Sequence, residues 1–125
     1  MLRLPALLLS LAFVVGCPTG TPTFDEVQED VFTLSCAFST CHGAGQEAEL
    51  GLTDAASSWA DIVNVASVEE PGETRVIPGD SENSLLFKVL DMDVGAIRQM
   101  PVNSSVTPRQ RAMVKAWIDG GALQD

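Results

Sequence analysis

Apolar residues along the chain form one long run near the N-terminus and, after it, several helical patterns. The run covers residues 4–15 and is interrupted by Pro5 and Ser10 alone. From Thr23 onward, apolar residues recur every three or four positions, which is the spacing of an amphipathic helix. No segment shows an alternating strand pattern of comparable strength. We therefore expect an all-α fold of about four short helices joined by long loops.

The first and last predicted helices carry complete start signals. Thr23 and Glu26 form a capping box, and the helix that begins there runs into Cys36. Thr107 begins the last helix with the same kind of box, and Gly120 ends it. The expected inner faces consist of Phe24, Val27, Val31 and Leu34 in the first helix and of Met113, Val114, Trp117 and Ile118 in the last. We expect Phe24 and Trp117 to join these two helices through packing.

Two further helices are predicted between them. One begins at Asp54, and its apolar side consists of Ala55, Trp59, Ile62 and Val63. The other is expected from about Ser81 to Leu90, with Leu85, Leu86, Val89 and Leu90 buried. The segment 76–79 between them is predicted to be extended and to end in a turn.

The apolar run itself predicts an export signal. It follows Arg3, it is too short to span a bilayer as a mature helix, and it ends at Gly16 and Cys17. A small residue before a Cys resembles the lipobox of bacterial lipoproteins, in which the Cys is acylated. We therefore expect a signal peptide over residues 1–16, a tether over 17–22 and one domain over 23–125. An ordinary cleaved signal, with Cys17 left as a spare thiol, is the alternative.

Charge narrows the range of partners. The chain has 7 Lys and Arg against 17 Asp and Glu, for a formal net charge of -10. This acidity disfavours nucleic acid and electrostatic attachment to anionic lipid, so membrane contact is expected through the lipid on Cys17. The charge serves either solubility alone or the steering of a basic partner.

The remaining cysteines form the candidate chemistry. Cys36 and Cys41 are followed directly by His42, the one histidine of the chain, in a C-x-x-x-x-C-H pattern. This pattern is two residues longer than the C-x-x-C-H signature of c-type haem attachment. In that signature two nearby thiols add to the vinyl groups on one edge of the macrocycle, and the adjacent imidazole binds the iron. A plain Cys36–Cys41 disulfide beside a surface or core imidazole is the alternative.

Several separated segments together resemble a small cytochrome c domain of the planctomycete-type family. They are the C-H-G sequence ending at Gly43, the V-I-P-G-D-S-E-N-S sequence of residues 76–84, the Met100 and Pro101 pair, and the W-I-D-G-G-A sequence of residues 117–122. The segments follow the order of the family and span almost the whole mature domain. The longer spacing between the two cysteines is the main departure from the family pattern.

The resemblance implies a small helical bundle wrapped around one covalent haem c. Cys36 and Cys41 would carry the thioether links, with His42 as the proximal and Met100 as the distal iron ligand. The resemblance also suggests the carbonyl of Pro78, or one near it in the segment 76–79, as the acceptor for the other ring nitrogen of His42.

The residues themselves also favour Met100 as a ligand. It lies in a loop before the final helix, where Pro101 stiffens the backbone behind it. Met113 falls on an inner helix face and is interpreted as a core residue, whereas Met92 lies between two aspartates and is expected to be exposed. An ordinary buried methionine is the alternative for Met100.

These expectations predict an electron carrier and no enzyme. With imidazole and thioether both bound, the iron would have no open position for a substrate. The mature protein is expected to be a lipoprotein on the periplasmic side of the membrane. The outer membrane is favoured because Pro18 follows Cys17. Its partner would be a redox protein with a basic face, steered by Glu47, Glu49, Asp91 and Asp93. Two alternatives are a haem sensor or peroxidase with an open sixth site, and a haem-free disulfide-bonded lipoprotein that acts as an interaction module.

Overall fold

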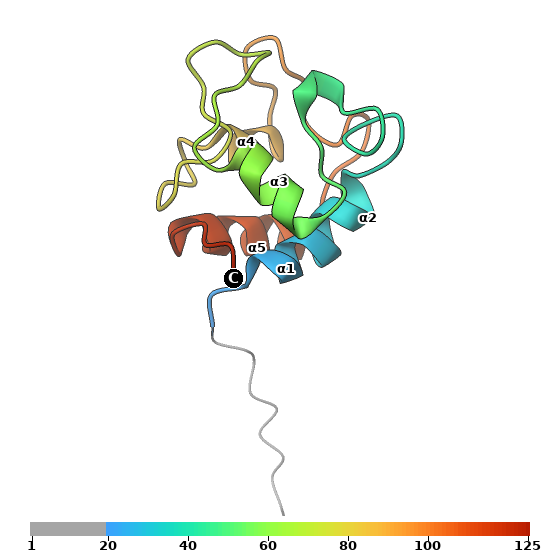
Figure 1. The fold of residues 1–125 in the computed structure, drawn as a ribbon. Coiled ribbons are helices and arrows are strands. Elements are labelled where there is room, and N and C mark those ends of the chain that lie inside the picture. Colours follow the sequence, from blue (N-terminus) through green and yellow to red (C-terminus); the bar gives the residue numbers. More distant parts are fainter. Residues whose placement is uncertain (1–19) are drawn as a thin grey trace, which may run out of the picture.

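A computed structural model describes residues 20–125 and gives an all-helical fold (Figure 1). The first helix is continuous but has three parts: α1 (Phe24–Val27), a π-helical turn η1 (Gln28–Phe32) and α2 (Thr33–Ser35). After a 3-10 turn, η2 (Glu47–Glu49), come three helices: α3 (Ala55–Ile62), α4 (Leu85–Val89) and α5 (Pro108–Asp119). Within residues 20–125 the backbone forms isolated β-bridges and no strand. The prediction of about four short helices is confirmed.

The helices begin where local capping chemistry allows it. The hydroxyl of Thr23 accepts a hydrogen bond from the Glu26 amide, and the Glu26 carboxylate accepts one from the Thr23 amide. Thr107 and Gln110 make the same reciprocal pair at the start of α5. These bonds satisfy amides that a helix start leaves without an intrahelical partner. Both predicted capping boxes are therefore confirmed.

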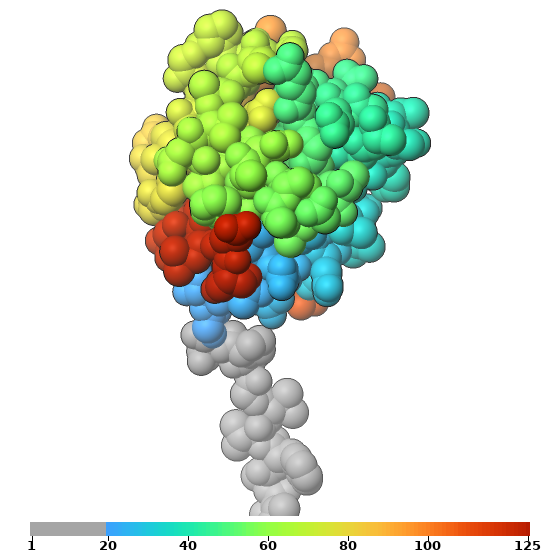
Figure 2. Space-filling view, in the orientation of Figure 1, coloured from blue at the N-terminus to red at the C-terminus, as the bar shows by residue number. Residues whose placement is uncertain are grey.

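The core lies where α1 and α5 pack side by side. In Figure 1 these two helices form the base of the molecule, and α3 crosses above them. The rings of Phe24 and Trp117 lie 4.8 Å apart between centroids, which confirms the predicted link between the first and last helices. Both side chains are buried, and truncation of a buried aromatic side chain costs about 3–5 kcal/mol. The space-filling view shows the C-terminal residues, in red, against the N-terminal helix, in blue (Figure 2).

The first helix differs from the prediction in one residue of its inner face. Val31 and Phe32 are buried, but Leu34 is 63% exposed. The reason is the π-helical turn, in which the Thr33 amide donates to the Gln28 carbonyl and one residue more than usual is fitted into the turn. The helical register after this turn is rotated, and Leu34 consequently points to solvent.

The predicted start of α4 at Ser81 is also wrong, because α4 begins at Leu85. Over residues 80–84, side chains form hydrogen bonds with backbone groups that would otherwise bond to each other in a helix. The Asp80 carboxylate accepts from the Asn83 amide, and the Ser84 hydroxyl donates to the Asp80 carbonyl (2.7 Å). Asp and Ser side chains favour turns over helix interiors for this reason.

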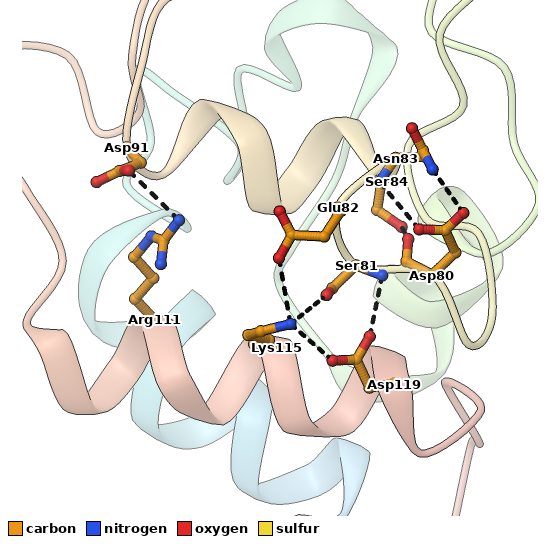
Figure 3. Close-up of polar contacts among 9 residues, drawn as sticks. All are labelled: Asp80, Ser81, Glu82, Asn83, Ser84, Asp91, Arg111, Lys115 and Asp119. Atoms are coloured by element: carbon orange, nitrogen blue, oxygen red, sulfur yellow. Dashed lines mark hydrogen bonds and ion pairs between the residues drawn. The ribbon is translucent and has the colours of Figure 1, made fainter.

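This turn is attached to α5 by a polar network (Figure 3). The Ser81 amide donates to the Asp119 carboxylate (3.1 Å), and the Lys115 ammonium donates to both Ser81 Oγ and Asp119 Oδ2 (2.9 Å each). Lys115 also forms an ion pair with Glu82 (3.2 Å). The network holds the loop before α4 on the outer side of α5.

The predicted signal peptide and the lipidation site Cys17 lie outside the described residues. Of the tether, residues 20–22 are described and have no helical structure. Over residues 20–125, none of the helices is long and apolar enough to cross a membrane.

Candidate functional site

The segment from Cys36 to His42 forms a closed loop at the end of the first helix. The amides of Cys36 and Ala37 both donate to the Phe32 carbonyl (2.8 Å each), and the His42 amide donates back to the Cys36 carbonyl (3.2 Å). The loop therefore accommodates the long cysteine spacing in a bulge that begins and ends at candidate ligands. Gly43 is required behind it, because a Cβ atom there would lie 2.5 Å from the Ala37 carbonyl oxygen.

Cys36 and Cys41 are both free thiols and both partly buried. The proposed alternative of a disulfide between them is not formed in the structure. Burial raises the pKa of the Cys36 thiol to about 12, and the charge of Cys41 adds to this effect. Cys36 is therefore a neutral thiol at physiological pH.

His42 is oriented by a carbonyl group that the sequence did not indicate. Its Nδ1 lies 3.2 Å from the Leu50 carbonyl oxygen, and its own carbonyl accepts from the Leu52 amide (2.7 Å). The expected acceptor in the segment 76–79 is wrong, because that segment turns to α5, where the Gly79 amide donates to the Ile118 carbonyl. With Nδ1 engaged as a donor, Nε2 is the ring nitrogen left for a ligand.

Three methionines lie in the described part of the chain, and Met100 is the one placed at this loop. Its amide donates to the Val89 carbonyl at the end of α4 (2.7 Å), which fixes the loop before α5. Met92 is 54% exposed, and Met113 packs partly buried against the core. The predicted positions of Met92 and Met113 are confirmed.

Two adjoining hollows meet at the candidate ligands. We call the first the inner cavity; its volume is about 130 Å³, and its apolar lining consists of Ala48, Leu50, Leu52, Ile62, Leu85, Leu86, Val89, Leu90 and Ile97. We call the second the outer groove; its volume is about 300 Å³, and it is lined by Leu34, Ser35, Phe38, Cys41, Pro101, Val102, Ser104 and Ser105. Cys36, His42 and Met100 line both.

All four predicted site residues therefore line one groove, although they come from two distant segments. Cys36, Cys41 and His42 come from the loop after α2, and Met100 comes from the loop before α5. The rim of the outer groove includes Leu34, Phe38 and Val102, which are exposed apolar side chains. Exposed apolar side chains gathered at one hollow mark a place where an apolar ligand or partner would be buried.

Sequence reasoning missed the polar side chains of the inner cavity. Arg75, Ser67 and Glu69 are its polar lining residues. Arg75 is a basic residue immediately before an apolar extended segment in an otherwise acidic domain. This position is the sequence feature that could have identified it as a lining residue.

The four acidic residues proposed to steer a partner are all exposed, but none lines either hollow. Asp91 forms an ion pair with Arg111 (3.4 Å), and the Asp93 carboxylate accepts from the Gln99 amide (2.7 Å). Glu47 and Glu49 lie on the 3-10 turn η2.

Over residues 20–125, no three His, Cys, Asp or Glu side chains are grouped so that they would hold a metal ion. Comparison with known proteins gives no family: no family model and no solved structure matches the chain. The chain is similar to the polyketide synthase GfsA of Streptomyces halstedii, with 32% identity over 109 residues, or 80% of this chain. It spans about 1% of the length of that protein, so the match assigns it to no family.

Proposed function

We propose that the protein is a c-type cytochrome that carries one covalent haem and transfers single electrons. One arrangement supports this proposal above all others. Cys36, Cys41, His42 and Met100 line a single groove, and that groove adjoins a cavity with an almost wholly apolar lining. Two free thiols, an imidazole nitrogen and a thioether sulfur are the donor set that such a haem requires, so the residues present fit the group.

Each residue has a distinct role in this proposal. Cys36 and Cys41 would form the thioether links, which would hold the group even in an unfolded chain. His42 would bind the iron through Nε2, while its hydrogen bond to the Leu50 carbonyl fixes the ring orientation. Met100 would be the second iron ligand, and the hydrogen bond from its amide to the Val89 carbonyl holds the loop before α5 in place. The haem, when bound, supplies an iron that changes between ferric and ferrous states by one electron.

The surrounding residues exclude water and keep the ligand set fixed. The inner cavity is lined by leucine, isoleucine and valine side chains from α3, from α4, from the loop before α3 and from the loop after α4. A low-polarity setting and a thioether ligand both favour the ferrous state and raise the reduction potential. With His42 and Met100 both as iron ligands, the group would have no open position for a substrate, and we therefore propose an electron carrier and not an enzyme.

The proposal extends to the location of the protein. Acylation of Cys17 would attach the domain to the periplasmic side of a bacterial membrane, with the outer membrane favoured. The net charge of -10 suits a redox partner with a basic face.

The role of Met100 is tested by an optical redox titration of the full chain produced with the cytochrome c maturation machinery. The wild type is expected to show a reversible one-electron transition and a low-spin spectrum. Met100→Ala is expected to keep the haem, to become high-spin and to favour the ferric state by about tenfold or more, because the thioether ligand is lost. Met92→Ala is the matched control, since it makes the same change at an exposed methionine.

A wild-type protein that is already high-spin would contradict the electron-carrier proposal and favour a sensor or peroxidase with an open site. A Met100→Ala protein that matches Met92→Ala in spectrum and potential would show that Met100 is an ordinary buried methionine.

A further inference from the structure

We infer that Asp61 is a positioning residue behind His42, which orients and strengthens the hydrogen-bond acceptor of the imidazole and thereby lowers the reduction potential. It acts through one peptide group, the one that joins Leu50 to Gly51. This inference rests on the proposed function, because it explains how a carboxylate that does not touch an iron ligand adjusts that ligand.

The first observation is that the peptide group between Leu50 and Gly51 is hydrogen-bonded at both ends. Its carbonyl oxygen lies 3.2 Å from Nδ1 of His42, and its amide donates to Oδ2 of Asp61 (3.1 Å). Carboxylate, peptide group and imidazole therefore form one series of hydrogen bonds. Hydrogen bonds in series polarise one another, so a charged acceptor at the amide makes the carbonyl a stronger acceptor for the imidazole N–H.

The second observation is that other bonds hold the backbone of residues 50–52. The Leu52 amide donates to the His42 carbonyl (2.7 Å), and the buried side-chain amide of Gln28 donates to the Leu52 carbonyl (2.9 Å). These bonds do not involve Asp61. A change of its side chain is therefore expected to alter the acceptor at the Leu50 carbonyl without moving the segment.

The third observation concerns the charge of Asp61. Over residues 20–125, Asp61 takes part in none of the ion pairs. The guanidinium of Arg75 bonds to the backbone carbonyl of Asp61 (2.8 Å) and not to its carboxylate. Gly51 is buried, and a hydrogen bond is electrostatically stronger in such low-dielectric surroundings. The carboxylate therefore acts on the Gly51 amide with its charge not neutralised by a bonded basic side chain.

These contacts have a defined effect on a bound iron. A stronger acceptor at Nδ1 makes the imidazole a stronger donor at Nε2. Ferric iron gains more from a stronger donor than ferrous iron does, because it carries the larger positive charge. Asp61 is therefore expected to favour the ferric state and to oppose the thioether of Met100, which favours the ferrous state.

Two simpler roles for Asp61 are separated by the choice of variant and of readout. If Asp61 only held the loop, Asp61→Asn would behave as wild type, because the amide oxygen of asparagine can still accept from Gly51. If its charge acted only through space, the potential would change but the hydrogen bond of His42 would not. Asp30→Asn is the matched control, since it removes the same charge from an exposed side chain on η1.

Both readouts are taken on the holoprotein. An optical redox titration gives the potential, and NMR of the ferrous protein with isotope-labelled histidine gives the Nδ1–H signal of His42, the one histidine of the chain. Asp61→Asn is expected to raise the ratio of ferrous to ferric protein at a fixed potential by about twofold to fivefold and to move the Nδ1–H signal upfield. Asp30→Asn should match wild type in both readouts. Asp61→Ser, which also has a neutral acceptor oxygen, makes the same test if Asp61→Asn does not fold.

Agreement between Asp61→Asn and Asp30→Asn in both readouts, with haem attached to each, would overturn the inference and leave the proposed function intact. A changed potential with an unchanged Nδ1–H signal would also overturn it, because the charge would then act through space. A shifted signal with an unchanged potential would overturn the effect of Asp61 on the potential. A wild-type chain with no attached haem, judged by its mass after denaturation, would overturn the proposed function and this inference together.

Discussion

At the scale of single residues, the two cysteines of the candidate site are not equivalent. Cys36 ends the first helix, where burial raises the pKa of its thiol to about 12. The thiolate is the reactive form in alkylation and in exchange. In the chain without haem, the folded structure therefore suppresses the reactivity of Cys36.

We expect alkylation of Cys36 by iodoacetamide at pH 8 to be slower by about 10³-fold in the folded haem-free chain than in the chain unfolded in urea. The factor follows from a thiol pKa raised from 9.0 to about 12. Peptide mass spectrometry of the reduced protein gives the rate for each cysteine separately. Cys41→Ser is the control, and Cys36 should stay slow in it because burial is the larger cause. Equal rates for Cys36 in folded and unfolded chains would contradict the burial of this thiol.

Predictions for single residues were correct where the surroundings of a residue come from its neighbours in the sequence. The exposure of Met92 followed from its two flanking aspartates, and it is confirmed. The acceptor for His42 was wrong, because Leu50 reaches the imidazole through a loop whose course no local pattern encodes. Arg75 was missed for the same reason, since its partners come from α3 and the 3-10 turn η2.

At the scale of elements, the attachment of the turn over residues 80–84 to α5 is an electrostatic contact with a defined pH dependence. The hydrogen bond from Lys115 lowers the pKa of the Asp119 carboxyl below its usual value of 3.8, with a further contribution from Ser81. A lowered pKa in the folded state means that the carboxylate stabilises the fold above the unfolded pKa. This stabilisation is lost as the pH falls through the lower pKa of the folded state.

We expect Asp119→Asn to lower the Tm of the protein at pH 7 by roughly a few degrees at most, since the contact is largely exposed. The difference in Tm between this variant and wild type should close below about pH 3.8, as the wild-type carboxyl becomes protonated. Thermal unfolding followed by circular dichroism at both pH values measures this. Glu29→Gln, an exposed carboxylate on η1, controls for the change in net charge. A Tm difference that persists unchanged at low pH would show that charge does not cause it.

Helix starts could be predicted from the sequence where they depend on side chains within three positions. Thr23, Asp54 and Thr107 all cap the helices expected of them. The exposure of Leu34 and the late start of α4 were not predicted. The first depends on a π-helical turn that shifts the register, and the second depends on competing hydrogen bonds from Asp80 and Ser84.

At the scale of the whole molecule, four helices form a small core and leave long loops around two adjoining hollows. Phe24, Trp117 and Ile118 are buried between α1 and α5, and the same core continues to Leu52 and Ile62 at the inner cavity. The upper half of the view in Figure 1 consists mainly of loops. A bulky apolar group between these loops would bury the exposed side chains at the rim of the outer groove, which is the physical reason for expecting one.

The spacing of Cys36, Cys41 and His42 and the position of Met100 before the final helix indicated the candidate site, and the resemblance to a cytochrome family named the same residues. Met100 and the cysteine segment line the same groove. The shape of the inner cavity could not be predicted, because it is formed by side chains from α3, α4 and three loops whose relative positions depend on the complete fold.

The central claim is that the chain holds a covalent haem, and the mass of the denatured protein tests it most directly. The full chain is produced with the cytochrome c maturation machinery, reduced, alkylated and measured intact under denaturing conditions. We expect the mass to rise by one haem, with Cys36 and Cys41 both unavailable to alkylation. A chain that carries no haem after denaturation, and whose two cysteines both accept the alkylating reagent, would contradict the account.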